Sequence, residues 1–356
     1  MNKFFDTGEP EIDWAWLKQY KRDDIFLIQS CYNAKWAQDL NLILRQIMPT
    51  EPLNNLISGV MSYDINKKLY AYNCLNNNDF KKADKIFLVS GDHQFEDVFI
   101  KKKVYGIWHN SGFTHPNAGL YNYVEKEWGI YVYKASTKIF VASDVFRDRL
   151  KRFSMEYMND GMGIEAHTVG FPILDEPQES KLSNLIIFNH RLNKDKHPEN
   201  LFKFPKDLKK RLIVSAPKRT MPGKYSFSSR VEMEIGKDKV FYNDYKKDDE
   251  YKKIMNSCGF GLSFAEPETF GYSVVEGIMS GLFYFVPKDE RSSTDEYMIS
   301  EFLFNNLDEL YDKIYFYSKE QNFNERIQLI KRQQQILYDK YNVKQWIENL
   351  IEGILL

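Results

Sequence analysis

Short apolar runs separated by stretches with helical spacing are the feature that most constrains the fold of this chain. In the first half the apolar runs are IFLIQS (25–30), LISGVMS (56–62), KIFLVSG (85–91), VYGIWHN (104–110) and KIFVASD (138–144). Strands that alternate with helices predict parallel sheets made of βαβ units. The pattern ends in VGFPILDEPQESKLS (169–183), which is rich in proline, serine and acidic residues and is therefore the expected linker.

A second cycle of apolar runs and helical stretches follows the linker. Its expected strands are residues 184–190, 211–217, 239–244, 260–265 and 282–287, and the chain is expected to be helical from Leu307 onward. The 356 residues also exceed what one hydrophobic core normally holds. We therefore expect an α/β fold with two Rossmann-like domains that face each other across a cleft, with a ligand at the carboxyl ends of the strands. The expected limits are 1–178, 179–335 and a C-terminal helix at 336–356 that packs back on the first domain.

Composition excludes several classes of protein. Apolar residues make up 43% and charged residues 28% of the chain, which are values of a globular protein, and the net charge is only −1. The three cysteines, Cys31, Cys74 and Cys258, are far apart and fit a reducing cytoplasm better than a disulfide framework. The acidic N-terminus does not read as a signal peptide, and no apolar run reaches the ~20 residues of a membrane span. We expect a cytoplasmic protein without stable membrane insertion.

The stretch SFAEPETFGYSVVEGIMSGLFYFVP (263–287) carries the most informative motif. Glu268 and Glu276 are separated by seven residues, the first at a strand-to-helix turn and the second about one turn into the helix. Phe270 and Gly271 are expected to make the turn, and Ser273 to cap the helix. A helix start offers backbone N–H groups and a positive dipole end, which suit a phosphate.

This stretch resembles the signature of glycosyltransferase family 4, a group of retaining enzymes with the GT-B fold. Glu, seven residues and Glu, with Phe-Gly inside and a helix that ends in Gly281 before an apolar strand, all match. The resemblance implies retaining transfer of a sugar from a nucleotide sugar, expected to be a UDP-sugar, to a hydroxyl acceptor. It implies that Glu268 faces the donor sugar and that Glu276 accepts hydrogen bonds from the ribose. The donor-binding set would be completed by Phe270, Gly271, Tyr272 and Ser273.

A second match lies upstream, in FNHRLNKDKHPENLF. Arg191 and Lys196 are five residues apart, directly after the first strand of the second cycle. The resemblance implies that both cations neutralise the donor diphosphate as the sugar leaves, because that is where negative charge develops. It also implies that His109, at the end of the strand VYGIWHN, faces the reacting end of the sugar. A packed or solvent-facing histidine is the alternative at this position.

No essential metal or cofactor is expected. His115 follows His109 by six residues, but no further cluster of ligands accompanies the pair, and the chain has no D-x-D triplet. The resemblance covers roughly residues 100–350. Relatives commonly have a Gly-rich loop after the first strand, whereas this chain has Ser30, Cys31, Tyr32 and Asn33 there.

The acceptor is the least readable property, because the first half diverges most. A saccharide, a lipid-linked saccharide, a protein and a hydroxylated base of phage DNA all remain candidates. Residues 1–103 hold 14 Lys/Arg and 14 Asp/Glu, which argues against a strong field for membranes or DNA. A basic face for DNA, or simply a solvated surface, would involve Lys101, Lys102, Lys103, Lys206, Lys209, Lys210, Arg211, Lys218 and Arg219. The competing functions are a non-catalytic nucleotide or nucleic-acid binding protein on a degenerate GT-B fold, and a sugar-nucleotide epimerase.

Overall fold

The computed structural model describes residues 14–29, 35–51, 70, 72–89, 102–108, 136–157, 165–217, 227–243, 249–265, 268 and 270–355. By its internal contacts the chain forms two compact units. The first contains Met1–Pro172 together with Val343–Leu356, and the second contains Ile173–Asn342. The domain limits expected from the sequence, at residues 178 and 335, stay predictions.

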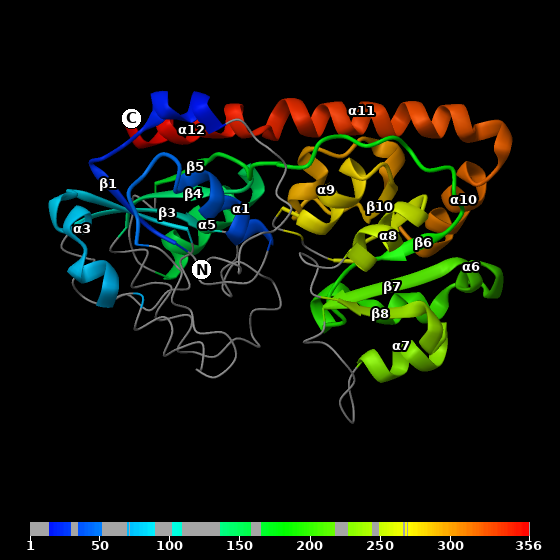
Figure 1. Cartoon of the computed structure of the whole chain (residues 1–356). Coiled ribbons are helices and arrows are strands. Elements are labelled where there is room, and N and C mark those ends of the chain that lie inside the picture. Colours follow the sequence, from blue (N-terminus) through cyan, green and yellow to red (C-terminus); the bar gives the residue numbers. More distant parts are fainter. Residues whose placement is uncertain are drawn as a thin grey trace. The chain divides into compact units, whose positions relative to one another are not determined.

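The first unit contains a parallel sheet (Figure 1). Its strands lie in chain order and are β1 (Ile25–Ile28), β2 (Lys85–Leu88), β3 (Lys103–Trp108), β4 (Ser136–Val141) and β5 (Ala166–Thr168). The helical elements described with them are a 3-10 helix (Trp14–Tyr20), α1 (Lys35–Leu44), α3 (Asn78–Lys82), α5 (Asp144–Tyr157) and α12 (Val343–Leu355). The strand expected at 56–62 lies outside the described residues.

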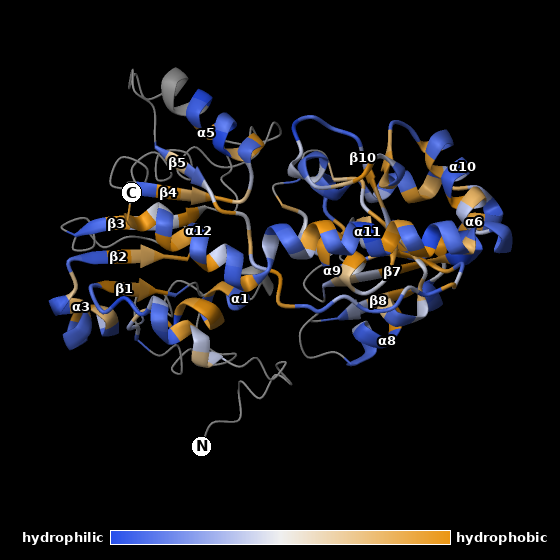
Figure 2. Ribbon diagram, turned by 90° about the horizontal axis from the view of Figure 1, so that it is seen from above, coloured by the Kyte–Doolittle hydropathy of each residue, from blue (hydrophilic) through white to orange (hydrophobic). Residues whose placement is uncertain are grey.

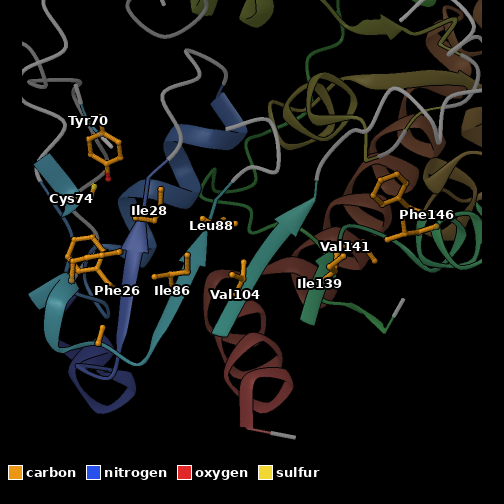
Figure 3. Close-up of a cluster of buried hydrophobic side chains, with 13 residues drawn as sticks. Phe26, Ile28, Tyr70, Cys74, Ile86, Leu88, Val104, Ile139, Val141 and Phe146 are labelled. Atoms are coloured by element: carbon orange, nitrogen blue, oxygen red, sulfur yellow. The ribbon is translucent and has the colours of Figure 1, made fainter. Parts of the chain in front are cut away.

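Alternate residues of these strands form a buried cluster on one face of the first sheet (Figure 3). Phe26 and Ile28 of β1, Ile86 and Leu88 of β2, and Val104 of β3 belong to it and are at most 3% exposed. Helices α3 and α5 contribute further aromatic side chains to the same cluster. The period of two along the strands therefore places one half of the apolar residues in this core.

Helix α12 packs in the same unit. A Cβ at Gly353 would approach the Phe140 ring to 2.7 Å, so the helix lies directly against β4. The buried Lys138 ammonium donates a hydrogen bond to the Gly353 carbonyl at 2.9 Å, and the Trp346 indole donates to the Gly170 carbonyl at 3.1 Å. The last helix is thus fixed by both apolar packing and buried hydrogen bonds.

The second unit contains another parallel sheet. Its strands are β6 (Ile186–Phe188), β7 (Leu212–Pro217), β8 (Val240–Asn243), β9 (Phe260–Leu262), β10 (Phe283–Pro287) and β11 (Leu303–Phe304). They lie in the order β11-β10-β9-β6-β7-β8, and every neighbouring pair is parallel. The chain leaves β6 in one direction through β7 and β8 and then returns to β9 on the other side of β6. This doubly wound order reverses between β6 and β9, the place where such sheets bind ligands.

Helices connect and cover the strands of the second unit. They are α6 (Lys206–Arg211), α7 (Phe227–Ile235), α8 (Asp249–Ser257), α9 (Tyr272–Met279), α10 (Leu307–Tyr317) and α11 (Phe323–Tyr341). Short 3-10 helices cover Lys194–Lys196, Pro198–Lys203, Lys237–Lys239, Ser293–Glu296, Ser300–Phe302 and Glu320–Asn322. Hydrophilic and hydrophobic residues alternate along α11 (Figure 2), as the apolar stripe predicted for this segment requires.

The predicted fold class is confirmed in that both units are α/β and both sheets are parallel. The segment HPENLFKF (197–204), whose apolar spacing favours a helix, contains a 3-10 helix at Pro198–Lys203. The first residue of the segment, His197, adopts the left-handed conformation with φ 44° as the N-cap, and Pro198 occupies the first helical position. Among the described residues, no helix combines the length and the hydrophobicity needed to cross a membrane.

Candidate functional site

The predicted cations and the first predicted carboxylate follow the two central strands of the second sheet. Arg191 and Lys196 come after β6, and Glu268 comes after β9. The Lys196 Nζ atom lies 2.6 Å from Glu268 Oε2, and both side chains are only about one-seventh exposed, at 14% and 13%. The structure therefore brings these two residues together at the point where the strand order reverses.

Arg191 is held by its own loop. Its Nη2 atom donates to Asp195 Oδ2 at 3.0 Å, and the two side chains are 37% and 30% exposed. Because Asp195 directly precedes Lys196, this ion pair stiffens the short turn that carries both cations. The pair is accessible enough for another anion to compete with Asp195.

The backbone of Glu268 is fixed by two serines that follow β10. Ser292 Oγ accepts a hydrogen bond from the Glu268 N–H at 3.0 Å. The Ser293 N–H and hydroxyl both donate to the Glu268 carbonyl, at 2.9 and 3.0 Å. Neither serine belongs to a motif visible in the sequence. A partial signal was present, since both serines follow the strand at 282–287 within a few residues and the carboxyl ends of parallel strands lie at one edge of a sheet.

Gly271 makes the turn into α9. It has φ 80°, a left-handed conformation that suits glycine, and a Cβ there would come within 3.1 Å of both Glu268 Cγ and Tyr297 Oη. The Tyr297 hydroxyl donates to the Phe270 carbonyl at 2.6 Å and thereby fixes the preceding residue. The expectation that Ser273 caps the helix is wrong, because Gly271 is the N-cap and Ser273 lies inside the first turn.

Glu276 lies in the second turn of α9 and receives a hydrogen bond from α8. The Tyr251 hydroxyl donates to Glu276 Oε2 at 2.8 Å, although Tyr251 itself is only 2% exposed. Asn189, at the end of β6, donates through Nδ2 to the Tyr251 hydroxyl at 3.3 Å and to the Ser273 carbonyl at 3.2 Å. Asn189 lies in the segment predicted as a strand at 184–190 and directly follows β6, and neither Asn189 nor Tyr251 belongs to a motif visible in the sequence.

His190 is a neutral histidine close to Arg191 and Lys196. Burial, assisted by the nearby Lys196 and Arg191 charges and opposed by Glu268, lowers the pKa of His190 to about 3. Its Nε2 atom lies 3.0 Å from the Tyr284 hydroxyl, which also donates to Asn189 Oδ1. His190 is thus uncharged near neutral pH and adds no third positive charge to this site.

Several sequence predictions fall on residues that the structure does not describe. They are His109, His115, the loop Ser30, Cys31, Tyr32 and Asn33, and the basic residues Lys101, Lys218 and Arg219. Of the other basic residues, Lys209 pairs with Glu234 at 3.3 Å and Arg211 donates to the Ser318 hydroxyl. Within the described ranges, no group of three or more His, Cys, Asp and Glu is arranged to bind a metal.

The arrangement can bind an anion and a polyol side by side. Two basic side chains and the start of α9, which has no side-chain cap, supply positive charge and N–H donors. Glu268 and Glu276 supply carboxylate oxygens, which accept hydrogen bonds from hydroxyl groups. Predicted donor-binding residues Phe270, Gly271 and Tyr272 form the turn and helix start between the two carboxylates.

No model of a known protein family matches the chain, and no curated protein sequence matches it. The fold does match solved structures. Sucrose-phosphate synthase from Thermosynechococcus elongatus aligns with a TM-score of 0.66 and 13% identity over 94% of this chain and 98% of that one. HepE from Anabaena, solved in complex with UDP-glucose, aligns with a TM-score of 0.62 and 14% identity over 93% and 98%. The pneumococcal O-GlcNAc transferase GtfA, solved with UDP and GlcNAc, aligns with a TM-score of 0.53 and 17% identity over 76% and 57%. The chain therefore has the fold of GT-B glycosyltransferases.

Proposed function

We propose that this protein is a nucleotide-sugar-dependent glycosyltransferase that moves a sugar to a hydroxyl acceptor with retention of the anomeric configuration. The observation that supports it most is the meeting of Lys196 and Glu268 at 2.6 Å, after the two strands between which the sheet order reverses. Similarity of fold to enzymes solved with UDP or UDP-sugars agrees with this reading. A UDP-sugar is accordingly the donor to test first.

We assign a role in the proposed reaction to each of the predicted site residues. Arg191 and Lys196 bind the diphosphate and stabilise the charge that grows on it as the sugar–oxygen bond breaks. Glu268 accepts hydrogen bonds from the sugar hydroxyls, and Glu276 accepts them from the ribose. His109 would help to hold the sugar. The departing phosphate oxygen takes the acceptor proton on the same face of the sugar, so no protein carboxylate is required as a base.

Positive charge from side chains and from the start of α9 replaces a metal in this proposal. We therefore expect full activity in the presence of EDTA. Complete loss of activity in EDTA, restored by Mg²⁺ or Mn²⁺, would contradict the assignment of phosphate binding to Arg191, Lys196 and α9.

The acceptor we propose is a saccharide. The alternative of a DNA base would need a continuous basic face, whereas on the described part of the surface Lys209 is paired with an acid and Asp207 interrupts the lysines of α6. Mass spectrometry of saccharide and DNA acceptors after incubation with a UDP-sugar separates the two. A mass increase of one sugar on DNA alone would overturn the saccharide proposal.

The first experiment measures binding and turnover separately. Calorimetry with UDP is followed by measurement of UDP released from a panel of nucleotide sugars without acceptor. Glu276→Ala should weaken UDP binding by about 1–3 kcal/mol, because a buried pair of hydroxyls loses its acceptor. A protein that binds UDP but releases none from any donor would be the non-catalytic binder considered from the sequence. Unchanged UDP affinity in a folded Glu276→Ala variant would remove the ribose assignment.

A further inference from the structure

The hydrogen bond between Tyr251 and Glu276 joins α8 to α9, and the proposed reaction assigns no role to Tyr251. Tyr251 is the third residue of α8, and its hydroxyl lies 2.8 Å from Glu276 Oε2 of α9. Its side chain is almost completely buried, whereas Glu276 is partly exposed. The hydroxyl thus reaches Glu276 from the protein interior.

Tyr251 is itself held in one orientation. Its hydroxyl accepts a hydrogen bond from Asn189 Nδ2, and a phenol has one hydrogen, so that hydrogen is directed to the carboxylate. Asn189 is fully buried and is held at both atoms of its amide, through Nδ2 by the Ser273 carbonyl and through Oδ1 by the Tyr284 hydroxyl. The amide therefore has little freedom to turn away from Tyr251.

Tyr284 is the rigid end of this chain of hydrogen bonds. A Cβ at Gly261 or at Gly277 would lie within 2.3 Å of its ring, so the ring is clamped between a strand and a helix that only glycine allows to come this close. Its hydroxyl also contacts the Leu262 carbonyl and His190. Burial lowers the pKa of His190 to about 3, so the imidazole that contacts Tyr284 is uncharged near neutral pH.

We propose that Tyr251 is a positioning residue for Glu276, and that it makes the site selective for nucleotides that carry ribose hydroxyls. This inference rests on the proposed function, in which Glu276 accepts hydrogen bonds from the ribose. Asn189 donates to Tyr251 and Tyr251 donates to Glu276, which stabilises the ionised carboxylate in one rotamer. A fixed, ionised acceptor binds a vicinal diol more strongly than one that must be ordered on binding.

The test compares UDP with 2′,3′-dideoxy-UDP by calorimetry. In the wild type, UDP should bind at least tenfold more tightly than the dideoxy analogue. Tyr251→Phe removes the hydroxyl while keeping the ring, and should weaken UDP binding about tenfold, the effect of losing one hydrogen bond to a charged group. It should change dideoxy-UDP binding less than about twofold, because that ligand does not use Glu276. A change in packing alone would weaken both ligands equally.

Two further variants make the comparison specific. Tyr315→Phe removes a tyrosine–carboxylate hydrogen bond elsewhere in the second unit, to Asp207 at 2.9 Å, and should leave the affinities for both ligands unchanged. In a Glu276→Ala background, Tyr251→Phe should cause no further loss of UDP affinity, because the two side chains act as one unit. Tyr251→Met provides a second variant without the hydroxyl if Tyr251→Phe does not fold.

The outcomes separate this inference from the function on which it rests. If the wild type binds neither UDP nor its dideoxy analogue, this inference fails together with the choice of a UDP-sugar as the donor, and the panel of other nucleotide sugars then tests the proposed function itself. If the wild type prefers UDP and Tyr251→Phe keeps the full preference, the role of Tyr251 is wrong and the proposed function stands. A selective loss of UDP affinity in Tyr251→Phe and not in Tyr315→Phe supports the inference.

Discussion

Lys196 and Glu268 follow adjacent parallel strands, β6 and β9, and their charged atoms lie 2.6 Å apart in a largely buried ion pair. In the proposed site, a bound nucleotide sugar would replace this ion pair with two new contacts. A diphosphate would take over the ammonium, and sugar hydroxyls would take over the carboxylate. The ion pair keeps both charges compensated before the ligand arrives, since a buried charge without a partner is costly.

Substitution of Lys196 should therefore affect turnover more than binding. Lys196→Ala is expected to lower kcat about 100-fold, because its charge matters most as the diphosphate departs, and to weaken UDP binding less than about tenfold. The control is Lys194→Ala, an exposed lysine in the same short turn, which should leave both quantities unchanged. Steady-state kinetics and calorimetry give the two numbers. A loss confined to UDP affinity, with kcat intact, would assign Lys196 to simple binding.

Gly271→Ala should damage both stability and donor binding. The left-handed backbone costs a non-glycine residue about 1–2 kcal/mol, and the new Cβ would press on Glu268 Cγ. Gly236→Ala is the control for backbone strain alone, since its φ of 107° is also unfavourable for alanine and its Cβ meets only the flexible Asp238 side chain. Chemical unfolding should show a loss in both variants, whereas only Gly271→Ala should lose UDP affinity. Unchanged UDP affinity in Gly271→Ala would mean that the turn does not shape the site.

His190 makes the stability of the protein depend on pH. Folded His190 has a pKa of about 3, whereas an unfolded histidine has one near 6.5. Between these values the unfolded state binds the additional proton, so the free energy of unfolding falls as the pH is lowered through this window, by at most about 1.4 kcal/mol per pH unit. His190→Gln should reduce this slope. Urea unfolding at several pH values measures it, and an unchanged slope would show that folded His190 takes up a proton.

Arg326 is expected to be a major source of stability in the second unit. It is a fully buried residue of α11, and its guanidinium carbon lies 3.9 Å from the centre of the Phe260 ring. Its Nη2 atom donates hydrogen bonds to the carbonyls of Lys181, Ser183 and Gly259. Arg326→Met keeps much of the volume but removes these hydrogen bonds, and should cost about 2–4 kcal/mol of unfolding free energy.

The exposed Arg332 of the same helix provides the control for this substitution. Arg332→Met should change the free energy of unfolding by less than about 0.5 kcal/mol. Equal effects of the two substitutions, measured by urea unfolding, would mean that the three carbonyl contacts of Arg326 contribute nothing.

Much of the fold could be predicted from the sequence because apolar patterning determines which segments are buried. The runs at 25–30, 85–91 and 260–265 are strands, with ends that are a few residues shorter than predicted. Strand β11, two residues long, carries no detectable pattern. The left-handed conformation of His197, before the 3-10 helix at Pro198–Lys203, is also not readable from the sequence.

The candidate site, like the fold, could be predicted only in part from the sequence. Glu268, Glu276, Arg191 and Lys196 stand in motifs whose spacing is visible in the sequence. Their supports are not visible there, because Ser292 and Tyr251 reach the site from other elements through tertiary contacts. A buried tyrosine on the apolar side of an amphipathic helix, such as Tyr251 in α8, gives no functional signal until the helix is packed against its neighbour.

The most direct measurement of the central claim is an NMR spectrum of the anomeric proton in the product formed from an α-linked UDP-sugar and a saccharide acceptor. We predict a new α-linked product whose formation is abolished by the double substitution Arg191→Ala and Lys196→Ala. Retention follows if the departing phosphate accepts the acceptor proton on its own face of the sugar. A β-linked product would contradict retention and require a protein base, and the absence of any transferred sugar with every donor tested would contradict the proposed function itself.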